Sequence, residues 1–460
     1  MKSGKPCEPL AKVGIARRGF LKHGLAAGVA TAIPFPFVNV RYGLAAPEPI
    51  RVGVVGCGGR GTGAALNVLQ AKTKVIYPPP RKGYHTENAV PGAKAMAENV
   101  EVIALADVFR DRLEECRAQL RAVGTSIRDE CCFVGFDACE KLLQVPGLNY
   151  VILASPPVFR PRELRAAIEA GKHVFMEKPA AVDAPGVRSI LESGEMAKRK
   201  NLGIVAGTIR RHSADQIETV SRLHDGAIGK IVEARAYFNI GEIWMIPREA
   251  GWGQMEWQLR NWPYFTWASG DILVEQHIHT IDLVNWIMGA SPVRAYGMGG
   301  RLARPSWEYG HIYDHFAIEY EYPKNIHLLS TCRQIDGTVG DVSEWLVGTK
   351  GRWGTPGHNY ELTGPNPWKV KTKGYDNEPY NQEHTDLVKH IREGKQINEL
   401  ENVANSTLTA IMGRMAAYTG QEVTWEAALN SKEVLMPQDL SFDMTLPVPE
   451  VAVPGKTKLI

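Results

Sequence analysis

A short apolar stretch that runs directly into a glycine-rich loop constrains this chain more than any other feature. Residues 50–55 read IRVGVV, GCGGRG follows at 56–61, and a helical pattern continues to about residue 70. Glycines between a buried strand and a helix let backbone amides and the helix N-terminus approach a pyrophosphate with no side chain in between. This pattern predicts a dinucleotide site, and a tight structural turn is the alternative. The expected cofactor contacts in the loop are Gly56, Gly58, Gly59, Arg60 and Gly61.

Asp107 supplies the acidic residue that should follow the second strand and bind the adenosine ribose. It ends the run VIALAD at 102–107 and lies 46 residues after Gly61, where about 20 is usual. The excess falls in residues 71–100, whose prolines and glycines predict an inserted loop. A carboxylate here repels a 2'-phosphate, so we expect NAD rather than NADP, although Arg110 and Arg112 nearby oppose that preference.

Strands and helices alternate from residue 50 to about 179, which indicates a doubly wound parallel sheet. Beyond about residue 230, short apolar runs separated by turns predict an antiparallel sheet, at 231–238, 293–299, 315–322, 326–332 and 343–348. Residues 383–417 are expected to be helical. We divide the 460 residues into a leader and linker at 1–46, a dinucleotide-binding domain at 47–179, an α+β domain for substrate and oligomer contacts at 180–434, and an extended tail at 435–460.

The stretch SGDILVEQHIHTIDLVNW at 269–286 carries the side chains that we expect to do chemistry. One helix is predicted from about residue 272 to 288, with Asp271 as its N-cap and Gly289 at its end. Four side chains share one face at helical spacing, while His277 points elsewhere. A surface helix with a polar side is the alternative. The four residues are Glu275, His279, Asp282 and Trp286.

A metal site is a second alternative for the same stretch. Glu275, His277 and His279 alternate, so on a strand all three would face one way and offer ligands to zinc or iron. The helical pattern argues against a strand, and we expect no metal. The six cysteines after residue 46 show neither metal-binding spacing nor a disulfide framework, so we predict mostly free, buried thiols.

Aromatic residues are concentrated at 241–267. Because sugar rings stack their apolar faces on indole, this density predicts one wall of a carbohydrate site, and a small core beneath a long loop is the alternative. A polar cluster at 309–315 is expected to form the opposite wall. The substrate contacts predicted from these segments are Trp262, Tyr264, Trp267, His311 and Tyr313.

Three motifs together resemble the Gfo/Idh/MocA family of nicotinamide-dependent sugar and polyol oxidoreductases: the loop at 56–61, AGKHVFMEKP at 170–179, and His279 three residues before Asp282. The resemblance extends over about residues 50–430. It implies a Rossmann domain followed by an α+β domain with a large open sheet, and it places Lys178 beside the nicotinamide and the substrate. Further cofactor contacts are expected at Ser155, Pro156 and Glu177, and further substrate contacts at Arg211, His277 and Asp282.

The family chemistry is hydride transfer from a carbinol, which requires a base at the hydroxyl. His279 is the expected base, and Lys178 is expected to stabilise the developing alkoxide. Glu275 stands where relatives usually have aspartate, and is expected to orient the imidazole or to hold a substrate hydroxyl. Two other departures are Arg160, where many relatives have histidine, and His277, where glycine is frequent. A sugar-binding protein without turnover is the alternative, and relatives often pair through the open sheet, so we expect a homo-oligomer.

The first 46 residues resemble a twin-arginine export signal, with a weakly apolar run at 24–38 and small residues at 45–46. We expect export to the periplasm by the twin-arginine translocation machinery, and an uncleaved membrane anchor is the alternative. Without this segment 46 basic and 49 acidic residues remain, so no overall field attracts nucleic acid or an anionic membrane. The motif residues are Arg17, Arg18, Phe20, Leu21 and Lys22.

Export bears on the cofactor, because the periplasm offers no ordinary pool of exchangeable NAD. A simple dehydrogenase would stop there after one turnover. We therefore predict tightly bound NAD that is restored within each cycle. Two routes achieve this: oxidation of one sugar coupled to reduction of another, as in the glucose-fructose oxidoreductase branch, or transient oxidation at sugar C3 with elimination, hydration and reduction, as in NAD-dependent glycosidases.

Overall fold

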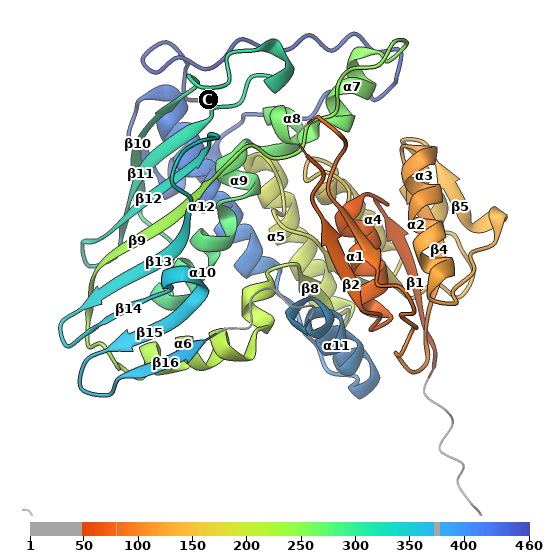
Figure 1. The fold of residues 1–460 in the computed structure, drawn as a ribbon, viewed down its shortest axis with the longest axis horizontal. Coiled ribbons are helices and arrows are strands. Elements are labelled where there is room, and N and C mark those ends of the chain that lie inside the picture. Colours follow the sequence, from red (N-terminus) through yellow and green to blue (C-terminus); the bar gives the residue numbers. More distant parts are fainter. Residues whose placement is uncertain (1–47, 80, 372–377) are drawn as a thin grey trace, which may run out of the picture. The chain divides into compact units, whose positions relative to one another are not determined.

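Six parallel strands form the first sheet, in the order β5-β4-β1-β6-β7-β8 (Figure 1). The computed structural model describes residues 48–79, 81–371 and 378–460, and the expected export signal with its cleavage site lies outside them. Apolar runs such as YVIL in β6 are wholly buried, as in parallel sheets with helices on both faces. The strands are β1 (Ile50–Val55), β4 (Val100–Asp107), β5 (Cys132–Val134), β6 (Tyr150–Leu153), β7 (His173–Met176) and β8 (Ile204–Ala206).

Helices connect these strands, which confirms the expected doubly wound arrangement. β8 pairs in parallel with β7, so the sheet continues past the domain boundary that we expected at residue 179. The carboxyl ends of parallel strands share one edge of a sheet, and Gly56, Asp107, Ser155 and Glu177 lie at that edge here. The helices are α1 (Gly59–Val68), α2 (Arg110–Ala122), α3 (Ala138–Leu142), α4 (Arg160–Glu169) and α5 (Ala184–Arg199).

The insert at residues 71–100 contains a β-hairpin, so the expectation of a plain loop was wrong. β2 (Thr73–Ile76) and β3 (Thr86–Ala89) pair antiparallel in a separate two-stranded sheet. The Thr73 hydroxyl donates a 2.7 Å hydrogen bond to the buried Glu87 carboxylate on the opposite strand. Pro78 and Pro79 lie in the connection between the strands, where a missing N–H breaks no ladder bond.

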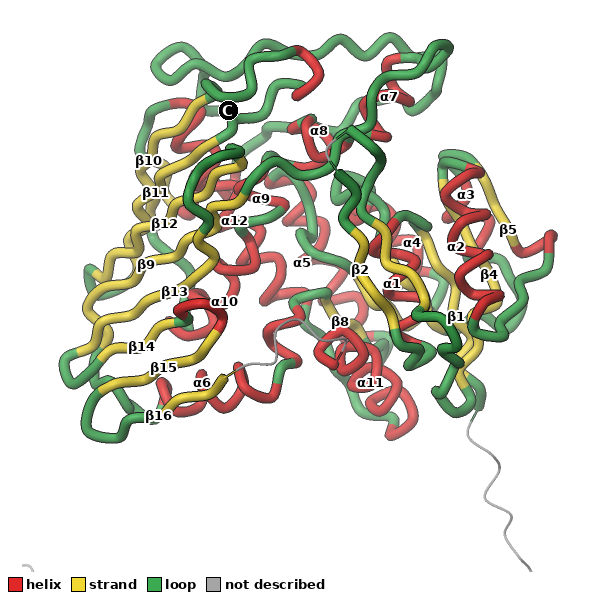
Figure 2. Tube along the Cα trace, in the orientation of Figure 1, coloured by secondary structure: helices red, strands yellow, loops and turns green. Residues whose placement is uncertain are grey.

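Nine strands form a second sheet, in the order β16-β15-β14-β13-β9-β12-β11-β10-β17. All neighbours are antiparallel except β9 and β12, so the five predicted runs lie in a mainly antiparallel sheet, as expected. Helix α12 (Leu400–Thr419) packs against β10 and β11 on one face (Figure 2). The strands are β9 (Ile231–Ile240), β10 (Arg294–Gly300), β11 (His315–Tyr322), β12 (Ile326–Gln334), β13 (Asp341–Gly348), β14 (Arg352–Gly354), β15 (Asn359–Thr363), β16 (Trp368–Lys371) and β17 (Val423–Thr424).

Two predicted helices are each divided in two. The stretch at 272–288 forms α9 (Ile272–Glu275) and α10 (Ile278–Met288). Between them the His277 N–H donates to the Ile272 carbonyl, five residues back, and the His277 imidazole bonds to Ser330 on β12, which interrupts a continuous helix. The stretch at 383–417 likewise forms α11 (Glu378–Glu393) and α12, with Gly394 in the left-handed region between them.

The C-terminal tail has no regular secondary structure and packs along the rest of the chain near α7 (Figure 1). The Tyr313 hydroxyl donates to the Ala452 carbonyl, and the Gly455 N–H donates to the Thr419 carbonyl. In the part of the chain that the structure describes, no helix has the length and apolar character needed to cross a bilayer. The other helices are α6 (Ala214–His224), α7 (Gln254–Arg260), α8 (Thr266–Ser269) and α13 (Trp425–Asn430).

Candidate active site

The glycine loop has the geometry that a dinucleotide requires. Gly56 has a φ of +86°, and a Cβ at this position would lie 2.4 Å from the Ser155 nitrogen. A Cβ at Gly61 would lie 1.7 Å from the Gly56 carbonyl oxygen. A Cβ at Gly58 would have no neighbouring atom within 4 Å. Gly58 is the N-cap of α1 and makes no side-chain hydrogen bond there, and the first turn of the helix contains no acidic residue. The N-terminus of α1 therefore has no side-chain cap from Gly58 and no acidic side chain in its first turn that would compete with a pyrophosphate.

Asp107 lies beside this loop at the end of β4. Its carboxylate accepts hydrogen bonds from the backbone N–H groups of Cys57, at 2.6 Å, and Phe109, at 2.8 Å. Burial raises the pKa of Asp107 to about 6, while these two bonds act in the opposite direction. The Asp107 carboxylate thus lies beside the glycine loop, as expected for a residue that binds the adenosine ribose, and a backbone N–H of that loop fixes its position.

Arg60 and Glu177, both predicted cofactor contacts, bind each other. The Arg60 Nε lies 2.7 Å from Glu177 Oε1, and Arg60 also forms an ion pair with Glu87 on β3 and stacks over Tyr380. These contacts fasten the start of α1 to the end of β7 and to the inserted hairpin. In this structure both side chains therefore hold neighbouring elements together through their ion pair.

Arg160 joins the loops that follow β6 and β7. Its guanidinium donates to the Ser155 carbonyl at 2.8 Å and to the Pro179 carbonyl at 2.5 Å. The Ser155 hydroxyl is engaged by the buried Glu163, so Ser155 and the adjoining Pro156 approach the glycine loop through their backbone. Arg160 thus fixes the two strand ends that flank the site.

Lys178 and Glu275 form a nearly buried ion pair, with side-chain exposures of 12% and 9%. The Lys178 Nζ donates to Glu275 Oε1 at 2.9 Å and to the Glu275 carbonyl oxygen at 2.7 Å. Gln276 Nε2 donates to the other carboxylate oxygen. Glu275 therefore holds Lys178, and the expectation that it orients the His279 imidazole is not met.

Lys178 and His279 line the same small, narrow pocket. Burial lowers the pKa of His279 well below its ordinary value, and the positive charges of Lys178 and Arg210 act in the same direction. The imidazole is therefore neutral at pH 7 and makes no hydrogen bond to any described residue, so it can accept a proton from a ligand. The lining residues are Lys178, Thr208, Arg210, Ile278, His279 and Asp282.

Asp282 and Arg211, both predicted substrate contacts, bind each other one helical turn beyond His279. Arg211 donates to both Asp282 oxygens, with its Nε at 2.9 Å from Oδ2, and Ser406 donates to Oδ1 at 2.7 Å. The guanidinium lies 5.1 Å from the centre of the Trp286 ring. This network supports the floor of the pocket, and Asp282 has few acceptor positions left for a substrate.

Most of the predicted aromatic wall is a small core beneath the 241–267 segment, which was the alternative. Tyr264 is fully buried and donates to the Ile243 carbonyl, and Trp267 is buried and donates to Gln258. Trp262 is partly exposed and packs against the same core.

The opposite wall predicted at 309–315 does not form either. Tyr313 is buried, with its hydroxyl bound to the tail, and His311 is buried beside Phe265, where burial lowers its pKa to about 4. His277 is fully buried between Ser330 and Thr280 and is not a substrate contact. His311 and Tyr313 were assigned to a site from local composition and His277 from the family resemblance, and neither reveals the direction of burial.

The alternating residues Glu275, His277 and His279 do not converge as metal ligands. Glu275 binds Lys178, His277 lies in the core, and His279 faces the pocket. Among the described residues, no three His, Cys, Asp or Glu side chains are placed to hold a metal ion. The six cysteines that the structure describes are free, and all but Cys132 are buried, as predicted.

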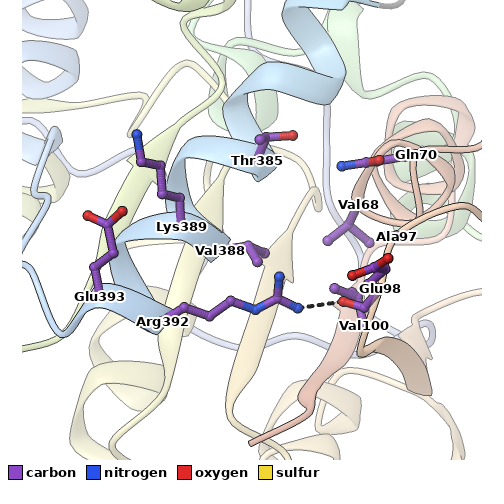
Figure 3. A pocket seen from close by; sticks show the side chains of 10 residues that line it. All are labelled: Val68, Gln70, Ala97, Glu98, Val100, Thr385, Val388, Lys389, Arg392 and Glu393. Atoms are coloured by element: carbon purple, nitrogen blue, oxygen red, sulfur yellow. Dashed lines mark hydrogen bonds between the residues drawn. The ribbon is translucent and has the colours of Figure 1, made fainter. Parts of the chain in front are cut away.

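A larger pocket, of about 280 Å³, lies between the end of α1 and α11 (Figure 3). Lys389, Arg392 and Glu393 project from α11 around it, and Arg392 donates to the Glu98 carbonyl across it. None of the predicted site residues lines it. We place the chemistry in the smaller pocket because only there does a neutral imidazole face a lysine ammonium.

Sequence reasoning missed Thr208 and Arg210 in the pocket wall, and His85 near it. Arg210 adjoins the predicted Arg211 and forms an ion pair with the buried Glu344. The signal that was available for Thr208 and Arg210 is their position after a strand of the parallel sheet, β8, which was expected to lie outside the cofactor domain. His85 carried no such signal because it lies in the insert.

Comparison with known proteins agrees with this fold. A model of the oxidoreductase family Gfo/Idh/MocA, with an NAD-binding Rossmann fold, matches residues 50–207, and a model of the Gfo/Idh/MocA C-terminal domain matches residues 218–353. The crystal structure of aldose-aldose oxidoreductase from Caulobacter crescentus complexed with glycerol superposes with a TM-score of 0.61, at 16% identity, over 82% of this chain and 100% of that one.

Curated relatives align over part of the chain. The scyllo-inositol 2-dehydrogenase (NAD(+)) of Bacillus subtilis is 25% identical over 50% of this chain and 57% of its own length. A glycosyl hydrolase family 109 protein of Solibacter usitatus is 23% identical over 41% of this chain and 37% of its own. The chain spans about half the length of such relatives. Both family models match, and they match in order. The glycine loop and Lys178 lie at one edge of the parallel sheet, and His279 lines the same pocket as Lys178. The chain therefore belongs to the Gfo/Idh/MocA oxidoreductase family.

Proposed function

We propose that this protein is an NAD-dependent oxidoreductase that acts on a sugar, polyol or glycoside by hydride transfer. The observation that carries the proposal is the pocket in which Lys178 and His279 meet, at the edge of the sheet that bears the glycine loop. The NAD-binding family model and the NAD-dependent inositol dehydrogenase among the relatives support the cofactor and the substrate class.

In this proposal His279 accepts the proton of the substrate hydroxyl, and Lys178 stabilises the negative charge that develops on its oxygen. Bound NAD⁺ supplies the acceptor for the hydrogen and electron pair that leave the carbinol carbon. The neutral His279 imidazole takes the hydroxyl proton. Lys178 donates to the same oxygen as negative charge develops on it, while Glu275 fixes the direction of the ammonium.

We further propose that the protein is exported by the twin-arginine route and that its NAD stays tightly bound and is regenerated within each turnover. The hydride taken from one sugar is then returned to the carbonyl of a second sugar, while the first sugar leaves in its oxidised form. Alternatively, the hydride is returned to the carbonyl of the same sugar after elimination of the aglycone and addition of water. The relative from glycosyl hydrolase family 109 supports the glycoside route as the second candidate.

The first experiment is to denature the purified protein and identify the released small molecules by mass spectrometry and absorbance. Stoichiometric NAD or NADH is expected. Incubation with sugar pairs and with aryl glycosides should then give product without accumulation of free NADH. Steady accumulation of NADH would contradict redox-neutral turnover, and a protein that binds sugar but never NAD would be a binding protein instead. Cell fractionation of wild type and an Arg17→Lys, Arg18→Lys variant tests export.

We propose that the protein forms a homo-oligomer whose subunits contact one another through the outer face of the nine-stranded sheet. Four large apolar side chains are exposed there on three strands, at 37–62%: Tyr296, Met298, Leu329 and Trp345. An apolar surface of this kind is typical of protein contacts. Light scattering should show a dimer or tetramer that Leu329→Asp dissociates, while Met96→Asp, at an exposed position of the insert, leaves it intact. A monomeric wild-type protein would contradict the proposal.

A further inference from the structure

The inserted hairpin at residues 71–100 is fastened to the cofactor domain beside the glycine loop (Figure 1). The Glu87 carboxylate on β3 accepts from the Arg60 guanidinium, and it lies so close to α1 that a Cβ at Gly63 would be 1.9 Å from its Oε2. Glu87 is only 3% exposed. The base of the hairpin is therefore a fixed part of the domain, and the described residues of its connection, 77–79 and 81–85, extend from this base.

That connection places His85 over the start of α1. A Cβ at Gly59 would lie 2.3 Å from the His85 carbonyl oxygen and 3.1 Å from its Nε2, so the imidazole stands beside the first residue of the helix. Its ring lies 6.0 Å from the Tyr77 ring and 6.4 Å from the Trp244 ring. Burial lowers the pKa of His85, with smaller effects of Glu275 and Lys178, so the ring is within electrostatic range of the catalytic pair.

The same connection reaches the second domain. Arg81 forms a two-pronged ion pair with Glu308, with nitrogen–oxygen distances of 2.9 and 3.3 Å. Tyr84 contacts the Trp244 ring on one side, and its hydroxyl bonds to Glu115 on α2 on the other. The described residues 81–85 thus contact the start of α1, α2 and the second domain.

The His85 imidazole makes no hydrogen bond to any described residue. A neutral imidazole carries one N–H donor, and the unoccupied donors at the start of α1 are those expected to meet phosphate oxygens. A side chain without a bonded partner among the described residues, held against Gly59 by an anchored hairpin, is placed to contact an anion bound at this helix N-terminus.

We infer that the insert is a clamp for the dinucleotide, in which His85 contacts the pyrophosphate or the adjoining ribose and the Arg81–Glu308 pair closes the segment over it. The inference rests on the proposed function, because it presupposes that NAD(H) binds the glycine loop. It gives tight retention of the cofactor a structural cause that belongs to this chain's own insert.

The test is the rate of NADH release from the full-length protein, followed by NADH fluorescence after mixing with excess NAD⁺ and without any substrate. His85→Ala should speed release about tenfold, as expected for one lost hydrogen bond to a charged group, and His85→Asn, which keeps a donor, should restore part of the retention. Arg81→Ala should speed release up to about fivefold, the most that an exposed ion pair provides.

Matched controls on the outer face of the large sheet are His327→Ala, whose imidazole pairs with Glu319, and Arg294→Ala, whose guanidinium pairs with Glu321. Both should leave release unchanged. Because Arg81 is exposed, its removal leaves folding intact, which thermal unfolding of the cofactor-free variants checks. Release rates of His85→Ala and Arg81→Ala within twofold of wild type would overturn the clamp alone. Absence of NAD(H) binding by the wild-type protein would overturn the proposed function, and the clamp with it.

Discussion

The Lys178 ammonium lies 2.9 Å from the Glu275 carboxylate and 2.7 Å from the carbonyl oxygen of the same residue. Two of its three N–H bonds are thereby directed at one residue, and the third is left for a ligand. Because both side chains are nearly buried, each one compensates the charge of the other. The pair is thus at once part of the proposed catalytic site and a contact between the cofactor domain and α9.

Lys178→Met should lower kcat/KM by a factor of about 10² to 10³, the usual effect of removing a donor to a developing oxyanion. NAD content should remain unchanged. The single variant should also unfold at a lower temperature, because Glu275 is left buried without a counter-charge, and Lys178→Met with Glu275→Gln should regain stability but not activity. Activity of Lys178→Met within tenfold of wild type would contradict the assigned role.

The acid limb of the kcat/KM profile should lie well below pH 6.5. The base must be neutral, and the pKa of His279 is lowered by burial and by Lys178 and Arg210, so the active form persists as the pH falls below the ordinary value for histidine. His279→Asn should abolish this limb together with most of the activity. An unshifted limb near pH 6.5 that survives in His279→Asn would assign the base to another residue.

Gly58→Ala should weaken NAD binding by about tenfold without loss of stability. The backbone there is extended and no atom lies within 4 Å of an added Cβ, so the apoprotein tolerates the methyl group, but that group projects from the cap of α1 where the pyrophosphate is expected. Isothermal titration and thermal unfolding measure both effects. Gly340→Ala, in an uncrowded loop, is the control and should change neither. Equal NAD affinities of Gly58→Ala and wild type would remove the cofactor from this loop.

Acid should destabilise the protein partly through His277. Burial lowers the pKa of His277 to about 3 in the folded protein, against about 6.5 in the unfolded chain. Between these values the unfolded state binds more protons, so the stabilisation is complete above pH 6.5 and is lost as the pH falls below it. Between pH 7 and pH 5 this amounts to about 2 kcal/mol. Urea unfolding of wild type and His277→Gln at both pH values measures it, and parallel losses in the two proteins would exclude His277 as the cause.

Local signals were sufficient wherever the chain repeats one pattern. The glycine loop, the alternation of strands and helices, and all five runs of the second sheet could be predicted because their periodicity records which faces are buried. Lys178 and His279 could be placed at one site because of motifs. The hairpin at 73–89 could not be predicted, because Pro78, Pro79 and Gly83 dominate the local pattern. The hydrogen bond between Thr73 and Glu87 that supports the strand pairing joins residues fourteen positions apart.

By itself the sequence determined the two-domain architecture, the dinucleotide loop and the pair of residues, Lys178 and His279, that line one pocket. The tertiary structure decided which polar and aromatic side chains face the pocket and which face the core. Tyr264, Trp267 and His277 are chemically suited to a sugar site, yet each has a hydrogen-bond partner in the interior. A buried polar group is stable only when such a partner exists, and the partner lies on an element whose position the local sequence does not encode.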